Sequence, residues 1–373
     1  MSKNLIVIGN GFDLYCGINS KFSNFFKYSK QNNQFYRIFM DNVLNDGSQY
    51  ALLNPENAFR SGKIPKFSSE FSFIDALFIL IFENKKIDYW NDVEGALYEE
   101  IVNNHPISLS KISYYVSKNK SYKQNANSIK LSDKEKLLAV MIDKQIDTTD
   151  FYNEYILEQL RFFEERFGEY IYSQISAESQ IARYHKEVRN ALMWIFDPQK
   201  GEYSPDKNDS GTIICSFNYI DISKAGLDEF DVENIHGSLK NSDLIIGITD
   251  NKYNPLYDKL TKSKRRFLLV EHNTIDYSGV TTVRLFGHSF NKQDYYYFIS
   301  LFNNIDLVNR YKDITFVILY SQHDNVDIEK IRRNNINNFT DMLSDYFRNV
   351  VHRPDLFDNI ASNVKSYDIT KKP

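Results

Sequence analysis

The stretch LIVIGNGFD, residues 5–13, decides the fold of this chain. Four consecutive apolar residues that stop at a Gly-x-Gly pair are typical of a buried parallel strand followed by a tight turn into a helix. Gly9 and Gly11 have no Cβ, so the backbone can turn sharply there and a ribose or phosphate can approach it closely. The stretch therefore predicts an α/β fold with a nucleotide at its first turn.

The same turn departs from the dinucleotide fingerprint of dehydrogenases. That fingerprint has a third glycine three residues after the second, where this chain has Leu14, and the next glycine is Gly17. The acidic residue expected about twenty positions further on is also missing, because residues 31–34 read QNNQ. The turn does not predict an ordinary dehydrogenase, and a purely structural role for Gly9 and Gly11 stays open.

Composition predicts a folded globular protein with no broad electrostatic partner. The chain has 373 residues, of which 42% are hydrophobic and 25% are charged, so it can bury a large core as two domains or as one domain with an insertion. Its formal net charge of -4 gives no general attraction to nucleic acid or to an anionic membrane.

The chain carries no sign of a secretory leader, a membrane span or a metal site. Residues 5–8 run directly into the glycine turn and so do not form the apolar segment of a signal peptide. The longest apolar region, residues 71–82, contains Asp75 and is too short to span a membrane, so we expect a cytoplasmic protein. Cys16 and Cys215 are too few for a disulfide framework or a four-cysteine zinc site. We expect no bound metal.

The second half of the chain predicts a parallel sheet. Apolar runs typical of short strands are followed by helical stretches at residues 294–302 and 328–347. Together with the N-terminal strand, this alternation predicts a Rossmann-like, mostly parallel sheet flanked by helices. The predicted strands lie at residues 212–217, 232–235, 244–248, 283–286 and 314–319.

The region between the first strand and residue 205 reads as helical. Apolar residues recur at steps of three and four from Ile156 to Tyr170, which predicts a long helix. Residues 112–145 are polar and read as exposed loops or as a mobile part of the helical region. We therefore expect a Rossmann-like domain made of residues 1–25 and 205–373. Residues 26–204 would form a large α-helical insertion after the first βα unit.

Polar side chains follow three of the predicted strands, at Asn218, His236 and His288. Because ligands in open α/β sheets bind beyond the carboxyl ends of the strands, these residues could meet in one crevice. Asn218 can hold ribose hydroxyls or a water, and His236 can take up a proton near neutral pH. Taken singly, Asn218 is equally a turn residue and His236 a buried structural side chain, while Asp294 is also placed to cap a helix.

We interpret two further features as structural and not as part of a functional site. Asn91 or Asp92 resembles a helix N-cap, which places Glu94 in the first turn of a helix, where an acidic side chain is favourable. We favour this structural role over one in which the Glu94 carboxylate reaches over the ligand cleft. Residues 259–266 contain five basic side chains, which we interpret as a solvated helix end or loop.

Several short motifs, in this order, resemble those of the AbiH family. The family is named for abortive infection, a bacterial defence against bacteriophage. They are GNGFD at residues 9–13 with Gly17 and Phe22, WNDVE at 90–94, FNY at 217–219, IHGS at 235–238, and FGHSF at 286–290 with Asp294. The series spans nearly the whole chain. Between its ends, the helical region offers little to match beyond residues 90–94.

More distantly, the series resembles sirtuin-like NAD-consuming domains. Gly9, Gly11, Gly17 with Ile18, Asn218, and His236 with Gly237 occupy the corresponding positions, whereas Asp13 stands in place of a serine, Asn19 in place of a proline, and the zinc-binding cysteines are absent. The resemblance implies NAD as substrate or ligand without a peptide deacylase activity. It implies Asn218 and His236 as catalytic residues, and it implies nucleotide contacts by Gly9, Asn10, Gly11, Phe12, Asp13, Gly17, Gly237, Gly287, His288, Ser289 and Asp294.

The resulting expectation is an antiphage protein that hydrolyses NAD or a related nucleotide at its N-glycosidic bond, as an NAD glycohydrolase. The alternative is a nucleotide-binding sensor or interaction module without turnover. A nuclease is poorly supported, because no carboxylates cluster at metal-ligand spacing. The sequence leaves open a phage-derived trigger, a host protein partner and a homo-oligomer.

Overall fold

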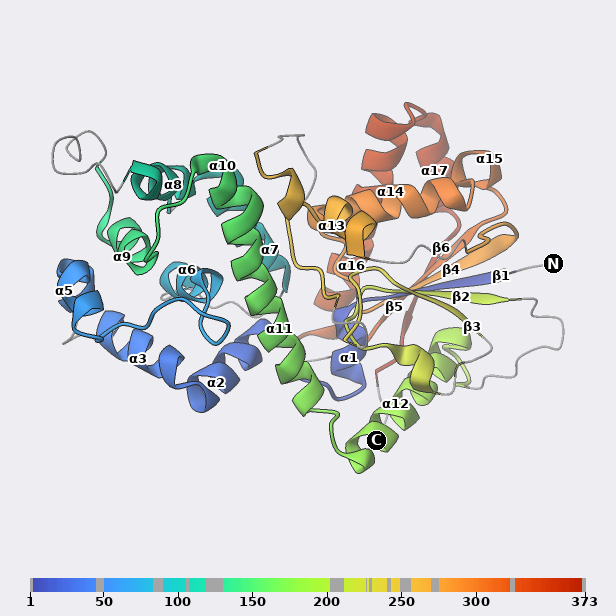
Figure 1. Cartoon of the computed structure of the whole chain (residues 1–373). Coiled ribbons are helices and arrows are strands. Elements are labelled where there is room, and N and C mark those ends of the chain that lie inside the picture. Colours follow the sequence, from blue (N-terminus) through green and yellow to red (C-terminus); the bar gives the residue numbers. More distant parts are fainter. Residues whose placement is uncertain are drawn as a thin grey trace. The chain divides into compact units, whose positions relative to one another are not determined.

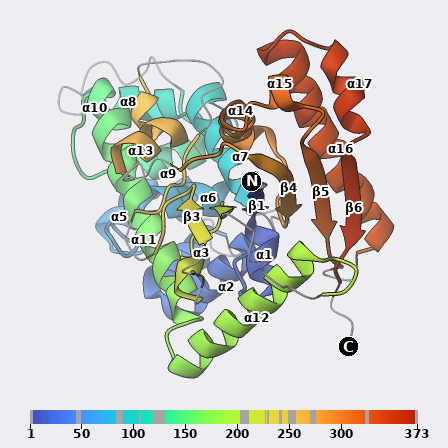
Figure 2. The same ribbon diagram turned by 90° about the vertical axis from the view of Figure 1, so that its right-hand side faces the viewer.

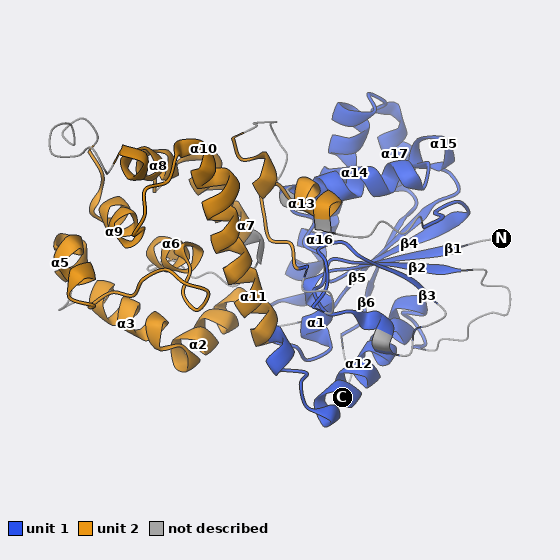
Figure 3. Ribbon diagram, in the orientation of Figure 1, with its two compact units in different colours: residues 1–20, 171–243, 269–373 blue, residues 21–170, 244–268 orange. Residues whose placement is uncertain are grey.

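The computed structural model describes two compact units, each built from separated stretches of the chain (Figures 1 and 3). The first unit comprises residues 1–20, 171–243 and 269–373, and the second comprises residues 21–170 and 244–268. Compared with the expected boundaries, residues 21–25 and 244–268 join the helical unit and residues 171–204 join the sheet unit. The described residues are 3–44, 50–82, 90–104, 107–118, 130–201, 211–225, 227, 230–239, 243–248, 256–269, 275–322 and 326–370.

The described residues of the first unit form a six-stranded, all-parallel sheet in the order β3-β2-β1-β4-β5-β6. This order is that of dinucleotide-binding Rossmann folds, with the topological switch point between β1 and β4. Figure 2 shows β4, β5 and β6 side by side. The strands are β1 (Lys3–Ile8), β2 (Thr212–Ser216), β3 (Phe230–Asn234), β4 (Val280–Phe286), β5 (Thr315–Tyr320) and β6 (Val364–Asp368).

Helices cover both faces of the sheet, which is why β1 is apolar on both sides. Leu5 and Val7 belong to one core cluster together with Phe298 of α14 and Phe339 of α16. On the other face, the Arg284 guanidinium of β4 donates to the Ile195 carbonyl of α12, at 3.3 Å. The helices of this unit are α1 (Asn10–Tyr15), α12 (Glu178–Phe196), α14 (Tyr295–Asn304), α15 (Leu307–Arg310), α16 (Ile328–Asp345) and α17 (Asp355–Ala361), with short turns at Ile222–Ala225, Lys292–Asp294 and Tyr346–Val350.

The second unit is helical in its described residues. Its core packs the aromatic rings of Phe22, Phe25, Phe78 and Phe163, with centroids 5.4 to 6.0 Å apart. The helices are α2 (Phe22–Asn32), α3 (Gln34–Val43), α4 (Tyr50–Leu53), α5 (Pro55–Arg60), α6 (Phe73–Phe82), α7 (Trp90–Tyr98), α8 (Leu109–Lys118), α9 (Asp133–Met141), α10 (Thr148–Asp150), α11 (Leu157–Ser173) and α13 (Lys262–Leu269), with further turns at Glu99–Asn103, Phe151–Ile156 and Asp258–Leu260. None of the helices in the described part of the chain is long and apolar enough to cross a bilayer.

The Rossmann-like sheet and the helical insertion after the first βα unit are confirmed, whereas one local prediction is wrong. Residues 244–248 form no strand of the sheet: Ile246 N–H donates to the Glu164 carboxylate at 2.6 Å, and Ile248 forms only an isolated bridge to Thr261. Within the polar stretch 112–145, residues up to Lys118 and from Asp133 to Met141 are helical, because Ile112, Val116, Leu137 and Leu138 are buried on one side. Residues 119–129 lie outside the described part.

Candidate functional site

The loops after β1 and β4 meet through their glycines. Gly9 N–H donates to the Phe286 carbonyl at 3.0 Å, and Gly11 N–H donates to the Gly287 carbonyl at 2.8 Å. A Cβ added at Gly287 would lie 2.3 Å from the backbone nitrogen of Phe12, and one added at Gly11 would lie 2.7 Å from Gly287 Cα. The glycines therefore allow two backbones to touch at the switch point, and the Gly11 N–H already has a protein acceptor.

Asp13, on α1, is buried beneath this turn. Only 2% of its surface is exposed, and its Oδ1 accepts a hydrogen bond of 3.0 Å from the hydroxyl of Tyr184 on α12. Burial raises the pKa of the Asp13 carboxyl to about 7, and the hydrogen bond from Tyr184 opposes that rise. Asp13 thus changes charge near neutral pH inside the sheet unit.

Three other residues that were predicted to contact a nucleotide lie in α1 or directly after it. Phe12 is fully buried and packs edge-on against Phe286. The carboxamide oxygen of Asn10 accepts a hydrogen bond from the Ser20 hydroxyl. Gly17 has φ +88°, the left-handed region that favours glycine.

Two histidines from different strand ends face the same carboxylate. Nε2 of His236 lies 3.4 Å from Oδ1 of Asp294, and Nε2 of His288 lies 3.3 Å from Oδ2 of the same side chain. Asp294 occupies the N-cap position of α14, yet its side chain makes no capping hydrogen bond. Its carboxylate is turned toward the two imidazoles, which supports a role other than helix capping.

The loop after β4 holds His288 in a defined orientation. Phe290 N–H donates to Nδ1 of His288 at 2.9 Å, so that Nδ1 is the unprotonated nitrogen of the neutral ring. Phe290 itself has φ +53°, although it is a buried aromatic residue. Such a conformation costs a non-glycine residue about 1–2 kcal/mol, and strain of this kind concentrates at functional sites.

Aromatic rings pack around both imidazoles. The Phe217 ring lies 5.3 Å from the His236 ring and 4.6 Å from the His288 ring, centroid to centroid. Tyr219 and Tyr297 contact His236 at 6.2 and 5.5 Å. The histidines are consequently 6% and 7% exposed, so their interaction with Asp294 is poorly screened by water.

Asn218 lies between Phe217 and Tyr219, the residues whose rings contact His236. Its backbone N–H donates to the Ser216 hydroxyl at 3.2 Å. Its side chain is buried, with 2% exposure, and neither Nδ2 nor Oδ1 has a hydrogen-bond partner among the described residues. A buried polar group left unsatisfied costs about 1–3 kcal/mol, so this amide is available to bind a group that the described residues do not supply.

Gly237 and Ser289, also predicted as ligand contacts, have local structural partners. Gly237 has φ +74°, and a Cβ there would lie 2.0 Å from the Asp243 carbonyl oxygen, while Ser238 N–H donates to the Asp243 carboxylate at 2.7 Å. Ser289 is exposed, and its hydroxyl accepts a hydrogen bond of 2.8 Å from Asn291. Both residues shape the loops that carry His236 and His288. No group of three or more His, Cys, Asp and Glu has metal-site geometry in the described part of the chain.

The basic segment 259–266 is solvated only in part: Lys259 and Lys264 are exposed, whereas Lys262 and Arg265 are buried. In the helical unit, Lys262 is 2% exposed, and its Nζ lies 2.6 Å from the Glu94 carboxylate. Arg265 is 3% exposed and donates from both terminal nitrogens to Glu164. Each of these two buried cations is paired with one buried carboxylate. The pair with Lys262 gives Glu94 a structural partner. Glu94 lies in the second described turn of α7, and the side chains of Asn91 and Asp92 are outside the described ones.

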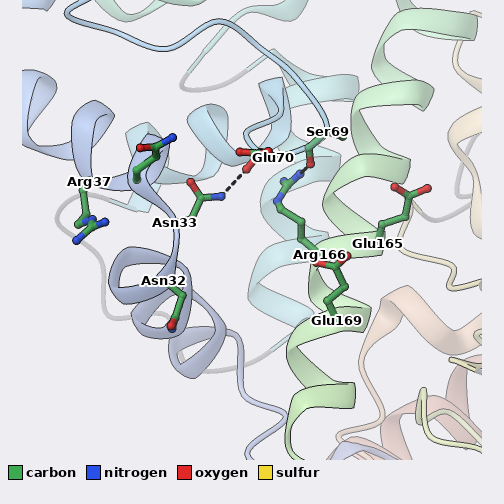
Figure 4. Close-up of a pocket in the computed structure, with 9 residues that line it drawn as sticks. Asn32, Asn33, Arg37, Ser69, Glu70, Glu165, Arg166 and Glu169 are labelled. Atoms are coloured by element: carbon green, nitrogen blue, oxygen red, sulfur yellow. Dashed lines mark hydrogen bonds between the residues drawn. The ribbon is translucent and has the colours of Figure 1, made fainter. Parts of the chain in front are cut away.

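A polar pocket of about 660 Å³ lies within the helical unit (Figure 4). Arg166 donates to the Ser69 carbonyl and to the buried carboxylate of Asp75. Asn33 donates to the Glu70 carbonyl at 2.6 Å and accepts from the first turn of α3. These side chains are therefore used by the helices themselves. The lining residues are Asn32, Asn33, Gln34, Arg37, Ser69, Glu70, Glu165, Arg166 and Glu169.

The fold and the side chains of Asn218, His236, His288 and Asp294 together define a Rossmann-like α/β protein with a buried polar site at the carboxyl edge of its sheet. The model of a protein family described as bacteriophage abortive infection AbiH matches residues 5–320. The chain therefore belongs to the AbiH family, and this membership supports a role in abortive infection of bacteriophage. No curated protein and no solved structure matches the chain.

Proposed function

We propose that this protein binds NAD or a related nucleotide at the strand-end site and hydrolyses its N-glycosidic bond during phage infection. The observation that carries the proposal is the buried amide of Asn218 after β2, which has no hydrogen-bond partner among the residues that the structure describes. An uncharged group that both donates and accepts suits a ribose hydroxyl or a bound water. The position next to the switch point of a Rossmann-order sheet is where such folds bind nucleotides.

The chemistry needs few groups. Cleavage of the nicotinamide–ribose bond passes through an oxocarbenium-like state, with the bonding electron pair leaving on the nicotinamide nitrogen, which neutralises the pyridinium. A water then adds to the anomeric carbon and gives up a proton. In this proposal Asn218 holds the ribose or the water, and His236 accepts the proton.

Burial of the site suggests that the resting protein turns over slowly. Asn218, His236 and His288 are all at most 7% exposed, so a nucleotide requires an opening movement before it can reach them. Depletion of NAD would harm the host cell, and a closed resting state restrains it. This supports activation during infection.

A nucleotide-binding sensor without turnover is the second candidate. It is favoured by the hydrogen bond from Gly11 N–H to the Gly287 carbonyl, which occupies a donor that a phosphate would otherwise take. In that case ligand binding would separate the loops after β1 and β4. The separation would be the signal.

The experiment measures NAD and nicotinamide in cells that express the chain during phage challenge, and nicotinamide release by protein purified from those cells. We expect release by the wild type and loss of it in Asn218→Ala and in His236→Ala. Asp306→Asn, at an exposed carboxylate in the N-cap position of α15, serves as the control. Retained release in both site variants would refute the assignment. Binding of ADP-ribose without any release would favour the sensor.

A further inference from the structure

We propose that the backbone of Gly287 fills the position in which a Rossmann-order sheet holds a phosphate, so that the strand-end site selects its ligand by the ribosyl group and not by the phosphates. The inference rests on the proposed function in taking Asn218 as the residue that binds the ribose. It narrows the ligand class to N-ribosyl compounds whose 5′ phosphate, if they carry one, makes no contact with the turn at Gly9 and Gly11.

The backbone amides at the start of α1 are already used by the protein. In dinucleotide-binding folds, such amides and the space left by the glycines receive the pyrophosphate. Here Gly11 N–H donates to the Gly287 carbonyl at 2.8 Å, and Gly9 N–H donates to the Phe286 carbonyl at 3.0 Å. Phe12 N–H donates to the Gly9 carbonyl at 2.8 Å. The carbonyl of Gly287 thus accepts the hydrogen bond that a phosphate oxygen would otherwise accept.

The space beside these glycines is also filled by backbone atoms. A Cβ built at Gly9 would lie 2.7 Å from the Gly287 carbonyl oxygen, and one built at Gly11 would lie 2.7 Å from Gly287 Cα. Because a phosphate is larger than a methyl group, it cannot enter unless the loop after β4 moves away. Asp13 also places a buried carboxyl in the first turn of α1, where the helix dipole favours an anion.

The loop after β4 is fixed by contacts that resist such a movement. The Asn338 side chain of α16 donates to the Ser289 carbonyl at 3.0 Å, and Phe290 N–H donates to Nδ1 of His288 at 2.9 Å. The ring of Phe290 packs against that of Phe339, with centroids 5.3 Å apart. Moving the loop away from the turn would break these contacts. We therefore expect the loops after β1 and β4 to stay together when a ligand binds.

Asn218, which follows β2, offers a side-chain amide that the described residues do not use. Neither Nδ2 nor Oδ1 has a hydrogen-bond partner among them, and the side chain is buried, with 2% exposure. An amide can donate to one ribose hydroxyl and accept from another. Those hydroxyls are the same in a nucleoside, a mononucleotide and a dinucleotide, so recognition through Asn218 is independent of the phosphates.

The first test compares nicotinamide riboside with nicotinamide mononucleotide, which differ by one 5′ phosphate. Each hydrogen bond to a charged phosphate is worth about tenfold or more, so a turn that held this phosphate with two amides would favour the mononucleotide by about 100-fold or more. We expect the two kcat/KM values for nicotinamide release by the full chain to agree within about tenfold, and Asn218→Ala to abolish or lower both alike. A larger preference for the mononucleotide, or a loss in Asn218→Ala confined to the mononucleotide, would overturn the proposal.

An NMR signal from Gly11 tests the turn directly. Asn10–Gly11 is the only Asn-Gly pair in the sequence, so the full chain labelled with carbonyl-¹³C asparagine and ¹⁵N glycine gives one doubly labelled amide, that of Gly11. We expect nicotinamide riboside, ADP-ribose and inorganic pyrophosphate to leave this signal in place, because its N–H keeps the Gly287 carbonyl as acceptor. A shift with pyrophosphate, or with ADP-ribose but not with nicotinamide riboside, would place a phosphate on the turn and overturn the proposal.

Hydrolysis and recognition can fail separately. Release of nicotinamide from both compounds together with a pyrophosphate-dependent shift at Gly11 would sustain the proposed function and refute the selection by the ribosyl group. Binding of ADP-ribose without any hydrolysis, and with the Gly11 signal unchanged, would refute the proposed chemistry and sustain that selection. No binding of ADP-ribose or of either nicotinamide compound would refute both.

Discussion

Substitution of Gly287 by alanine should destabilise the sheet unit far more than substitution of a glycine that has room for a methyl group. The new Cβ would lie 2.3 Å from the Phe12 backbone nitrogen and 2.7 Å from the Gly11 carbonyl carbon. Both obstacles are backbone atoms at the centre of the sheet edge, so no side chain can rotate away to relieve them.

The expected cost has three parts. Alanine at φ +70° pays about 1–2 kcal/mol for the left-handed conformation. Forcing a methyl group into a filled space adds about 1–3 kcal/mol. Separating the two loops also weakens the Gly11 N–H···O=C Gly287 hydrogen bond, worth about 1 kcal/mol. The sum is roughly 3–6 kcal/mol, a large part of the stability of an ordinary domain.

Gly17→Ala is the matched control, because it lies in the same unit. Its φ is +88°, and its new Cβ would meet only the end of the exposed Arg183 side chain, at 3.3 Å. Urea unfolding, with hydrogen exchange of peptides from β1 and β4 to report on the sheet unit, should show a loss of about 1–2 kcal/mol for this control. Equal losses for the two variants would refute the idea that close backbone contact requires glycine at 287.

Three further predictions follow from other buried groups. Asn218→Leu removes an amide that has no partner among the described residues, so the unliganded protein should be equally stable or about 1 kcal/mol more stable by urea unfolding, while ADP-ribose binding is lost. A destabilisation above about 2 kcal/mol would show that the amide has partners in solution. The pKa of Asp13, raised to about 7 in the folded state from 3.8, means that the folded protein binds a proton more tightly than the unfolded chain, so this group's contribution to stability is complete below about pH 4 and declines by up to about 4 kcal/mol as the pH rises through 7. Asp13→Asn should abolish that part of the pH dependence in unfolding measured between about pH 5 and 8, and a variant whose stability follows the wild type at every pH would contradict it. Arg265→Met leaves the Glu164 carboxylate buried without its cation and should cost about 3–5 kcal/mol, whereas Lys264→Met, two-fifths exposed or more on the same helix, should change stability by less than about 1 kcal/mol; comparable thermal unfolding of the two variants would argue against a buried pair.

Apolar runs were sufficient to predict most of the sheet. β1, β2 and β5 are buried on both faces over most of their length, so each reads as a hydrophobic segment, whereas β4, with the sequence VTTVRLF, is buried at four of its seven residues. β6, whose sequence is VKSYD, is an edge strand with partly exposed residues, and its pattern gives no such signal.

The apolar run at residues 244–248 was misleading for the opposite reason. Leu244, Ile245, Ile246 and Ile248 are as buried as strand residues, but they belong to the helical unit. The Ile246 N–H donates to the Glu164 carboxylate and its carbonyl accepts from the Arg265 guanidinium, instead of pairing with a neighbouring strand. Ile248 forms hydrogen bonds with the backbone of Leu260 and Lys262. Glu164, 82 residues before Ile246, and Arg265, 19 residues after it, cannot be foreseen as backbone partners from a local pattern.

For the site, the carboxyl-end rule placed His236 and His288 at one edge of the sheet, but it did not predict how they share a partner. Asp294 is at the N-cap position of α14, and only the three-dimensional structure shows that its carboxylate faces the imidazoles and makes no capping hydrogen bond. The strained φ of Phe290 likewise has no sequence signature, because aromatic residues rarely adopt it.

The division of each unit into separated stretches has a consequence for synthesis on the ribosome. The chain passes between the units four times, after residues 20, 170, 243 and 268. β1 occupies the middle of the sheet, yet its first partner strand begins at Thr212, about 200 residues later. At translation rates of about 5–20 residues per second, the LIVI segment waits roughly 10–40 s with both edges unpaired. An apolar strand exposed for that long is a natural client for chaperones, and slowing translation of the helical region should increase its aggregation.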